Sequence, residues 1–299
     1  MPSLQAIMLN KLFAKIPGDP PGTEHDYVAE RARNAERKPP KTPAGVILEE
    51  ITVGGQHAER TTKPGNDKGW VFYIHGGGFT TGSAKERRAI TLYIADKCGY
   101  NVISVDYRLA PENKWPAMPE DVLAGCKGLE ELGISLSDVI FMGESAGGTL
   151  VLSLALLCRQ EGLGQPKAVA TYSPCVRQAG HYPSHFDNIK TDTMLKDAVS
   201  KSLAEPVFGA DTTEEDMLDP IASPIMADYT GIAPIFISVS DAETLYDDSR
   251  VLYEKLMRAG HKTELDVAKG VCHAFQMLPN MLPEARKSIA KTFAFIESL

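Results

Sequence analysis

Short apolar runs and longer segments with helical spacing alternate along most of this chain. The apolar runs predict strands over 46–53, 69–74, 101–106, 139–142, 168–173, 234–239 and 263–268, with a weaker strand near 57–63. The helical spacing predicts helices near 85–98, 119–132, 146–160, 245–259 and 283–298. Several strands are nearly continuous apolar runs, as strands buried on both faces of a sheet are. The pattern therefore predicts an α/β fold with a mainly parallel sheet.

Two segments depart from this alternation. Residues 3–16 have the apolar spacing of a short amphipathic helix, which Pro17-Gly18 ends. Residues 177–230 hold no clear strand and one predicted helix, near 192–204. Because irregular insertions of this length are uncommon in compact domains, the second segment is either a functional lid or added surface structure.

Composition narrows the class of protein. With 299 residues, 43% of them hydrophobic and 23% charged, the chain has the make-up of a globular protein. Its net charge of −8 argues against nucleic acid and anionic membrane as main partners. The five cysteines form no CxxC pair, so we expect no disulfide framework, no zinc site and a reducing, cytoplasmic location. We expect no signal peptide and no stable membrane insertion, because no segment reaches the ~18 apolar residues of a membrane helix.

The most informative stretch is VIFMGESAGGTLVLSLALL, which begins at Val139. A predicted strand runs into Gly143-Glu144-Ser145-Ala146-Gly147, and an apolar helix follows. This is the G-x-S-x-G pattern in the strand-turn-helix setting of a nucleophile elbow. Such a turn holds the serine in a strained backbone conformation, and the flanking glycines leave room for it. The alternative is a Gly-Ser turn before a buried helix, since G-x-S-x-G alone is common by chance. We predict that Ser145 is a nucleophile.

A second glycine-rich turn, His75-Gly76-Gly77-Gly78, follows the strand at 69–74. Three glycines let a backbone pass close to a substrate with its N–H groups free. We expect the amides of Gly77, Gly78 and Ala146 to form an oxyanion hole. By itself the stretch is better explained as a flexible turn, but the presence of Ser145 favours the functional interpretation. Because His75 adjoins these donors, we predict a structural role for it rather than that of the general base.

A third motif, VDYRLAPENKWPAMPED at 105–121, joins HGGG and GESAG. With these motifs the chain resembles the α/β-hydrolase superfamily, specifically the hormone-sensitive-lipase-like (family IV) bacterial carboxylesterases, over roughly residues 46–299. The resemblance implies an eight-stranded, mostly parallel sheet flanked by helices. It also implies a helical cap, built from residues 1–45 and 177–230, over a catalytic core of 46–176 and 231–299. In the family the DYR segment braces the HGGG loop, so Asp106 and Arg108 are not expected to be catalytic.

The order of catalytic residues in this fold is serine, acid, histidine, which places the base late in the chain. Of the seven histidines, only His273 lies in a loop after the last predicted strand. The acid is expected in SDAETLYDDS at 240–249, where Asp241 and Glu243 both follow a strand. The family's acid-x-Leu-x-Asp pattern fits Glu243 alone, and the spacing from Glu243 to His273 (273 − 243 = 30 residues) matches that of family members. We predict Glu243 as the acid, with Asp241 as the alternative.

Together these residues predict a serine carboxylesterase that works through an acyl-enzyme intermediate, with no metal and no cofactor. The resemblance implies short-chain substrates, acetate to hexanoate esters, and makes a homodimer plausible. Three alternatives remain open. They are the same chemistry on another acyl bond (as in a deacetylase, lactonase, amidase or thioesterase), non-catalytic ligand binding as in the plant gibberellin receptors, and a lipase that touches membrane lipid through residues 3–16.

Overall fold

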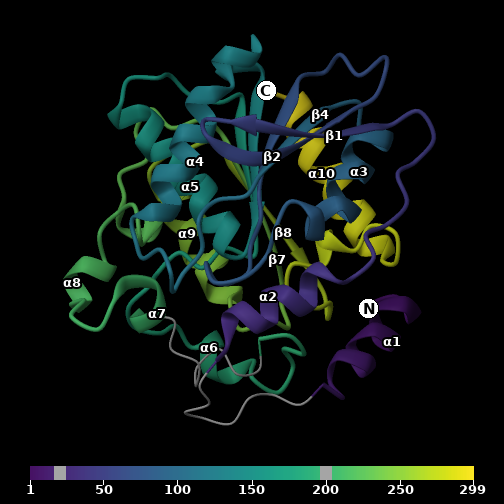
Figure 1. Cartoon of the computed structure of the whole chain (residues 1–299). Helices are drawn as coiled ribbons and strands as arrows, with labels where there is room; N and C mark the ends of the chain where they lie inside the picture. The colour runs from purple at the N-terminus through teal and green to yellow at the C-terminus, as the bar shows by residue number, and fades with distance from the viewer. Residues whose placement is uncertain (17–24, 196–203) are drawn as a thin grey trace.

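The computed structural model describes residues 1–16, 25–195 and 204–299. At its centre is one eight-stranded sheet, in the order β1-β2-β4-β3-β5-β6-β7-β8 (Figure 1). The strands are β1 (Ile47–Val53), β2 (Gln56–Thr62), β3 (Trp70–Ile74), β4 (Asn101–Val105), β5 (Val139–Glu144), β6 (Ala168–Tyr172), β7 (Ile235–Ser240) and β8 (Thr263–Ala268). The β1–β2 and β2–β4 pairs are antiparallel, and the pairs from β4 through β3 to β8 are parallel. The predicted α/β fold with its mostly parallel sheet is confirmed, including the weak strand near 57–63.

Helices cover both faces of this sheet. The longer ones are α1 (Leu4–Phe13), α2 (Tyr27–Ala35), α3 (Arg88–Lys97), α4 (Ala117–Gly128), α5 (Ala146–Gln160), α9 (Tyr246–Arg258) and α10 (Pro283–Glu297). Side chains alternate along β3, so that Phe72 and Ile74 pack in the core shared with α4, α5 and α9. Val71 and Tyr73 point to the opposite face and pack in the core shared with α3 and α10. Both faces of the central strands are therefore buried, which explains their continuous apolar runs.

The parallel strands place several loops at one edge of the sheet. Because β3, β5, β7 and β8 run in the same direction, the residues that follow each of them meet at their carboxyl ends. The two glycine-rich turns, the acidic stretch at 240–249 and the loop of His273 all lie at this edge.

The N-terminal helices attach to two of these loops. Asn10 of α1 donates a hydrogen bond to the Gly270 carbonyl at 2.9 Å, next to the loop of His273. Arg31 of α2 donates to the carbonyls of Thr80 and Ala110, close to the HGGG turn. Through these hydrogen bonds α1 and α2 contact the edge of the sheet that carries the candidate site, although they are remote from it in sequence.

Three segments differ from the prediction. No helix was predicted at α2, which buries only Tyr27 and begins at the side-chain cap of Asp26. The helix α1 ends at Phe13, before the predicted limit at residue 16. The helix predicted near 192–204 falls mostly on 196–203, outside the described residues. Residues 193–195 form a bend, and the short α7 (Ala204–Phe208) begins where the predicted helix ends.

Two further helices of the 177–230 segment were not predicted, α6 (Ser184–Asp187) and α8 (Glu214–Met217). Each is about one turn long, so neither has enough residues for an apolar periodicity. Local polar contacts define α8 instead, since Thr213 and Asp216 form a capping box at its start.

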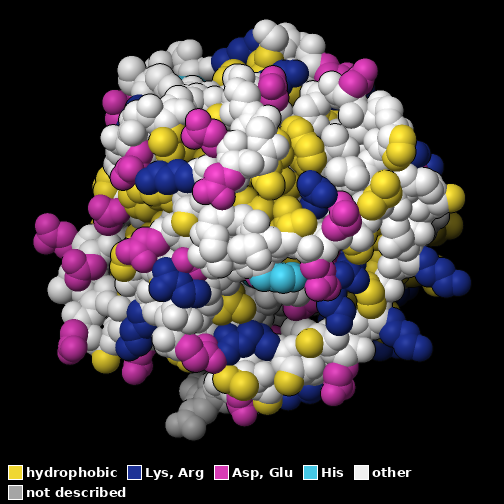
Figure 2. All heavy atoms as spheres, turned by 45° about the horizontal axis from the view of Figure 1, so that its top comes forward, with side chains coloured by type: hydrophobic (Ala, Val, Ile, Leu, Met, Phe, Trp, Pro, Cys, Tyr) yellow, Lys and Arg dark blue, Asp and Glu magenta, His cyan; other side chains and the backbone are white. Residues whose placement is uncertain are grey.

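The surface mixes charges of both signs. Figure 2 shows acidic and basic side chains interspersed over one face of the molecule, with apolar side chains between them. Among the described residues, no helix is both long enough and apolar enough to span a membrane.

Candidate active site

Ser145 occupies a sharp turn between β5 and α5. Its backbone lies in an unusual region, with φ 55° and ψ −124°. The turn brings the chain so close to the sheet that a Cβ on Gly147 would lie 2.1 Å from the Ile74 carbonyl oxygen, and one on Gly143 would lie 2.5 Å from the Gly147 carbonyl oxygen. Only glycine fits at these two positions, which is the physical reason for the G-x-S-x-G pattern.

The HGGG turn forms a loop beside Ser145, and two of its glycines line the same cavity. Gly77 and Gly78 have φ values of 123° and 61°, which favour glycine. Within the part of the chain that the structure describes, the amides of Gly77 and Gly78 donate to no protein acceptor. Both residues line the same pocket as Ser145 and Ala146. The three predicted donor residues therefore border one cavity.

His75 has the surroundings of a structural residue. Its side chain is fully buried, its Nδ1 lies 2.9 Å from the Gly76 carbonyl oxygen, and its ring stacks on Tyr107. The Tyr107 hydroxyl donates to the His75 carbonyl at 2.9 Å. Burial lowers the pKa of His75 below its ordinary value, so the ring is neutral. The DYR segment thus contacts the HGGG loop through its tyrosine.

Glu144, the residue before Ser145, joins the two glycine-rich turns. Its buried carboxylate accepts hydrogen bonds from the Gly76 amide at 2.6 Å, from Arg87 Nε at 2.5 Å and from the Tyr73 hydroxyl at 2.5 Å. Burial alone would lower the pKa of the Arg87 guanidinium, but the charge of Glu144 raises it above its usual range. A buried ion pair therefore fixes the distance between the nucleophile turn and the HGGG loop. The sequence reasoning missed this pair, because its members come from separate elements.

His273 and Glu243 form a buried pair. Nδ1 of His273 lies 2.7 Å from Oε2 of Glu243, and Oε1 of Glu243 accepts the Ser240 amide at 3.1 Å. The two side chains are 4% and 0% exposed. Burial alone would lower the pKa of His273, but the charge of Glu243 and its hydrogen bond reverse this and raise it above its ordinary value.

Asp241, the alternative acid, has a different environment. It is exposed, and its Oδ1 accepts the Gly270 amide at 2.7 Å. Its own amide donates to the Ala268 carbonyl at 3.0 Å and continues the β7–β8 ladder by one bond. Asp241 therefore holds the loop that leads to His273, and no hydrogen bond joins it to the imidazole among the described residues.

Backbone strain is concentrated around these groups. Four non-glycine residues among those described have positive φ values: Phe79, Ser145, Ser173 and Ala274. Phe79 follows the HGGG turn, Ala274 follows His273, and the Ala274 amide donates to Ser173 Oγ at 3.3 Å. Such strain persists only where the surrounding structure holds it, and it is typical of functional sites.

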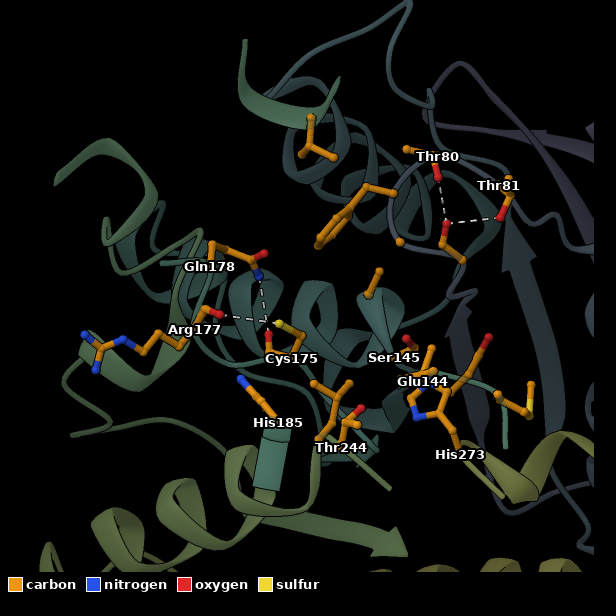
Figure 3. Close-up of a pocket in the computed structure, with 18 of the residues that line it drawn as sticks. Thr80, Thr81, Glu144, Ser145, Cys175, Arg177, Gln178, His185, Thr244 and His273 are labelled. Carbon is orange, nitrogen blue, oxygen red and sulfur yellow. Dashed lines mark hydrogen bonds between the residues drawn. The ribbon is translucent and has the colours of Figure 1, made fainter. Parts of the chain in front are cut away.

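The residues border a cavity of about 640 Å³. Figure 3 shows Ser145 and His273 next to each other on one side of it, with Cys175 and Gln178 across from them. The walls include side chains from α2 and from the 177–230 segment, namely Glu30, Met194, Leu195, Val207 and Phe208. Burial raises the pKa of the Cys175 thiol, which keeps it protonated and a poor nucleophile.

Two histidines spaced like metal ligands lie on another wall of this cavity. His181 and His185 both line it, but Nε2 of His185 lies 2.6 Å from Oδ2 of Asp248 and is already bonded. Among the described residues there is no group of three or more potential ligands that could hold a metal ion.

Comparison with known proteins agrees with this architecture. A family model for the alpha/beta hydrolase fold matches residues 71–277. An acetyl-hydrolase of Streptomyces hygroscopicus is 30% identical over 83% of this chain and 82% of its own length. An esterase of Acinetobacter venetianus is 30% identical over 87% of this chain and 84% of its own length.

Solved structures extend the similarity to nearly the whole chain. EstE5, in crystals soaked with p-nitrophenyl butyrate, superposes with a TM-score of 0.89 at 30% identity, covering 99% of this chain and 98% of EstE5. An esterase from the bacterial hormone-sensitive lipase family gives a TM-score of 0.87 at 29% identity, covering 100% of this chain and 99% of that one. The chain therefore belongs to the α/β-hydrolase fold family and, within it, to the hormone-sensitive-lipase-like esterases.

Proposed function

We propose that this protein is a serine carboxylesterase that hydrolyses short-chain acyl esters through an acyl-enzyme intermediate. The observation that carries the proposal is the buried Glu243–His273 pair, which borders the same cavity as the strained Ser145. A nucleophile, a base oriented by an acid, and free amides are the parts that acyl transfer requires. The similar proteins are named as an acetyl-hydrolase and an esterase, which supports this proposal.

The mechanism follows from the groups at the site. Ser145 Oγ attacks the ester carbonyl carbon while His273 Nε2 takes its proton, and Nδ1–H stays bonded to Glu243. The amides of Gly77, Gly78 and Ala146 stabilise the negative oxygen that forms. His273 then donates its proton to the departing alcohol oxygen, which leaves the acyl group on Ser145. Water, deprotonated by His273, attacks that acyl group, and His273 returns the proton to Ser145 Oγ as the acid leaves.

We further propose that residues 1–45 and 177–230 cap the site and limit the length of the acyl chain. Side chains of both segments form walls of the cavity, including Glu30 from the first and Phe208 from the second. A p-nitrophenyl ester series from C2 to C12 measures the preference, and we expect the highest kcat/KM between C2 and C6. A maximum at C10 or longer would refute the short-chain assignment. Ser145→Ala is the control: it should abolish turnover of every ester without unfolding the protein.

The second candidate is the same machinery on another acyl bond. The catalytic groups are the same for an amide, a lactone or a thioester, and the difference lies in how the leaving group is bound and protonated. Comparison of p-nitrophenyl acetate with p-nitroacetanilide separates the ester from the amide. Higher kcat/KM for the anilide would favour the amidase.

A further inference from the structure

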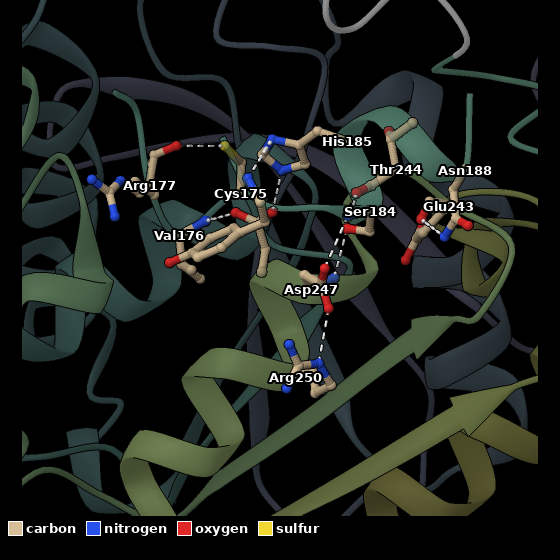
Figure 4. Close-up of polar contacts among 12 residues, drawn as sticks. Cys175, Val176, Arg177, Ser184, His185, Asn188, Glu243, Thr244, Asp247 and Arg250 are labelled. Atoms are coloured by element: carbon tan, nitrogen blue, oxygen red, sulfur yellow. Dashed lines mark hydrogen bonds and ion pairs between the residues drawn. The ribbon is translucent and has the colours of Figure 1, made fainter. Parts of the chain in front are cut away.

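Residues 182–192 contact the turn that carries Glu243 through several side chains. Figure 4 shows Ser184 and Asn188 of this segment next to Thr244 and Glu243. We call residues 241–245 the acid turn. Four consecutive carbonyls, those of residues 241–244, each accept a hydrogen bond from a side chain of this segment. Asn188 Nδ2 donates to Asp241 O at 3.2 Å and to Glu243 O at 2.8 Å, Thr191 Oγ1 donates to Ala242 O at 2.9 Å, and Ser184 Oγ donates to Thr244 O at 2.6 Å.

Asp192, at the end of this segment, has an uncommon position. Its side chain is 3% exposed, yet among the described residues it forms no ion pair. Oδ2 accepts the Thr244 amide at 2.8 Å and the Thr244 hydroxyl at 3.1 Å. Oδ1 accepts the amides of Met194 and Leu195 at 2.9 and 2.8 Å. Four donors thus stabilise one buried carboxylate that has no cationic partner within the described part of the chain.

A purely local role accounts for only half of these bonds. The Met194 and Leu195 amides lie two and three residues after Asp192, which is the ordinary arrangement of an aspartate that forms its own turn. The bonds to Thr244 span 52 residues and have no such local explanation. They attach Asp192 to the residue directly after Glu243.

The same carboxylate connects the acid turn to the substrate cavity. Met194 and Leu195, held through Oδ1, line that cavity, and so does Thr244, held through Oδ2. The acidic groups that act on His273 are Glu243, Asp192 and Glu144, and each raises the pKa of the imidazole.

We propose that Asp192 is a positioning residue, which holds the acid turn so that Glu243 stays bonded to His273 and couples that turn to the cavity wall at Met194 and Leu195. This inference rests on the proposed function, because it assigns Asp192 a part in orienting the catalytic acid. It predicts that loss of the carboxylate acts on the imidazole, although Asp192 does not contact it.

The test is Asp192→Asn in the full chain. Asparagine keeps the shape and one acceptor oxygen, so the turn at Met194 and Leu195 is retained, while its NH₂ group meets the Thr244 amide donor. We expect kcat for p-nitrophenyl butyrate to fall ~10–100-fold with a smaller change in KM, as small misplacements of catalytic groups produce. The fall of kcat/KM at low pH, called the acid limb below, should move its midpoint to lower pH by ~0.5 unit or more. The reason is that a negative charge that favours the imidazolium form of His273 is lost.

A second readout does not depend on turnover. The Nδ1–H proton of His273, bonded to Glu243, is measured by NMR in a Ser145→Ala background with and without Asp192→Asn. We expect its resonance to weaken or shift when Asp192 is replaced. The matched control is Asp187→Asn in the same segment. The Asp187 carboxylate is exposed and, among the described residues, has no hydrogen bond to the acid turn. The control should leave the resonance and the acid limb as in the wild type.

An unchanged resonance and an unchanged acid limb in folded Asp192→Asn would overturn the proposal, and so would equal changes in Asp187→Asn. If Asp192→Asn does not fold, the isosteric Thr244→Val takes its place, because it removes only the 3.1 Å bond from the Thr244 hydroxyl to Asp192. This variant should shift the His273 resonance in the same direction by a smaller amount. No shift would refute the proposal. A wild type that turns over no p-nitrophenyl ester refutes the proposed function instead, and the resonance then decides the role of Asp192 separately.

Discussion

Replacement of Glu243 by glutamine removes one charge from the site at almost constant shape. In the wild type both carboxylate oxygens accept a hydrogen bond, one from the Ser240 amide and one from His273. Glutamine has a single acceptor oxygen, so it cannot satisfy both donors. If its oxygen faces Ser240, its NH₂ group donates to Nδ1 of His273, and the imidazole proton then lies on Nε2. A protonated Nε2 cannot accept the proton of Ser145. If its oxygen faces His273, the NH₂ group opposes the Ser240 amide.

The expected loss follows from this tautomer effect and from burial. Loss of the carboxylate in a serine triad typically lowers kcat by about 10⁴-fold. At 1.36 kcal/mol for each tenfold change, this corresponds to about 5 kcal/mol of transition-state stabilisation. Glu243 is 0% exposed, so bulk water cannot take the place of the missing charge. We therefore expect Glu243→Gln to lie near the large end of such effects.

The assay is hydrolysis of p-nitrophenyl acetate by the wild type, Glu243→Gln and Asp241→Asn, with folding checked by circular dichroism. Asparagine at 241 retains an acceptor for the Gly270 amide at the surface, so kcat should stay within about twofold of wild type, as for most surface substitutions. A collapse of activity in Asp241→Asn together with an active Glu243→Gln would refute the assignment of the acid.

Two further outcomes follow from charges at the site. His273 must be neutral to accept a proton, and Glu243 raises its pKa. In a pH–rate profile kcat/KM should therefore fall at low pH with a midpoint above the ordinary histidine value of ~6.5. A midpoint well below 6 would contradict the pairing of His273 with Glu243. Arg87→Gln leaves the buried charge of Glu144 without its cationic partner, so the free energy of unfolding measured in urea should fall by about 3–5 kcal/mol. A fall of under about 1 kcal/mol would show that the pair does not stabilise the loop.

Local patterns were sufficient for much of this protein. Strands of the central sheet were predictable because burial on both faces requires continuous apolar runs, and Phe72 and Val71 show both faces in use. The G-x-S-x-G turn was predictable because part of its requirement for glycine is local: a Cβ on Gly143 would lie 2.5 Å from the Gly147 carbonyl oxygen within the same turn. Short polar helices such as α2 were not, since their stability comes from caps and contacts that leave no periodic trace.

The sequence alone therefore determined the strands of the sheet and the turn at Ser145, because each rests on residues that are neighbours in the chain, and the residue order of the resembled fold indicated a late histidine. The arrangement of Asp241 and Glu243, which are two positions apart, was decided only by tertiary structure. The β7–β8 ladder extends to the Asp241 amide and keeps that side chain at the surface, and the chain then turns inward so that Glu243 meets His273. The buried contacts of Glu144 with Arg87 and of Asp192 with Thr244 depend in the same way on distant segments. No local pattern encodes such contacts, because a hydrogen bond between segments depends on where the fold places both partners.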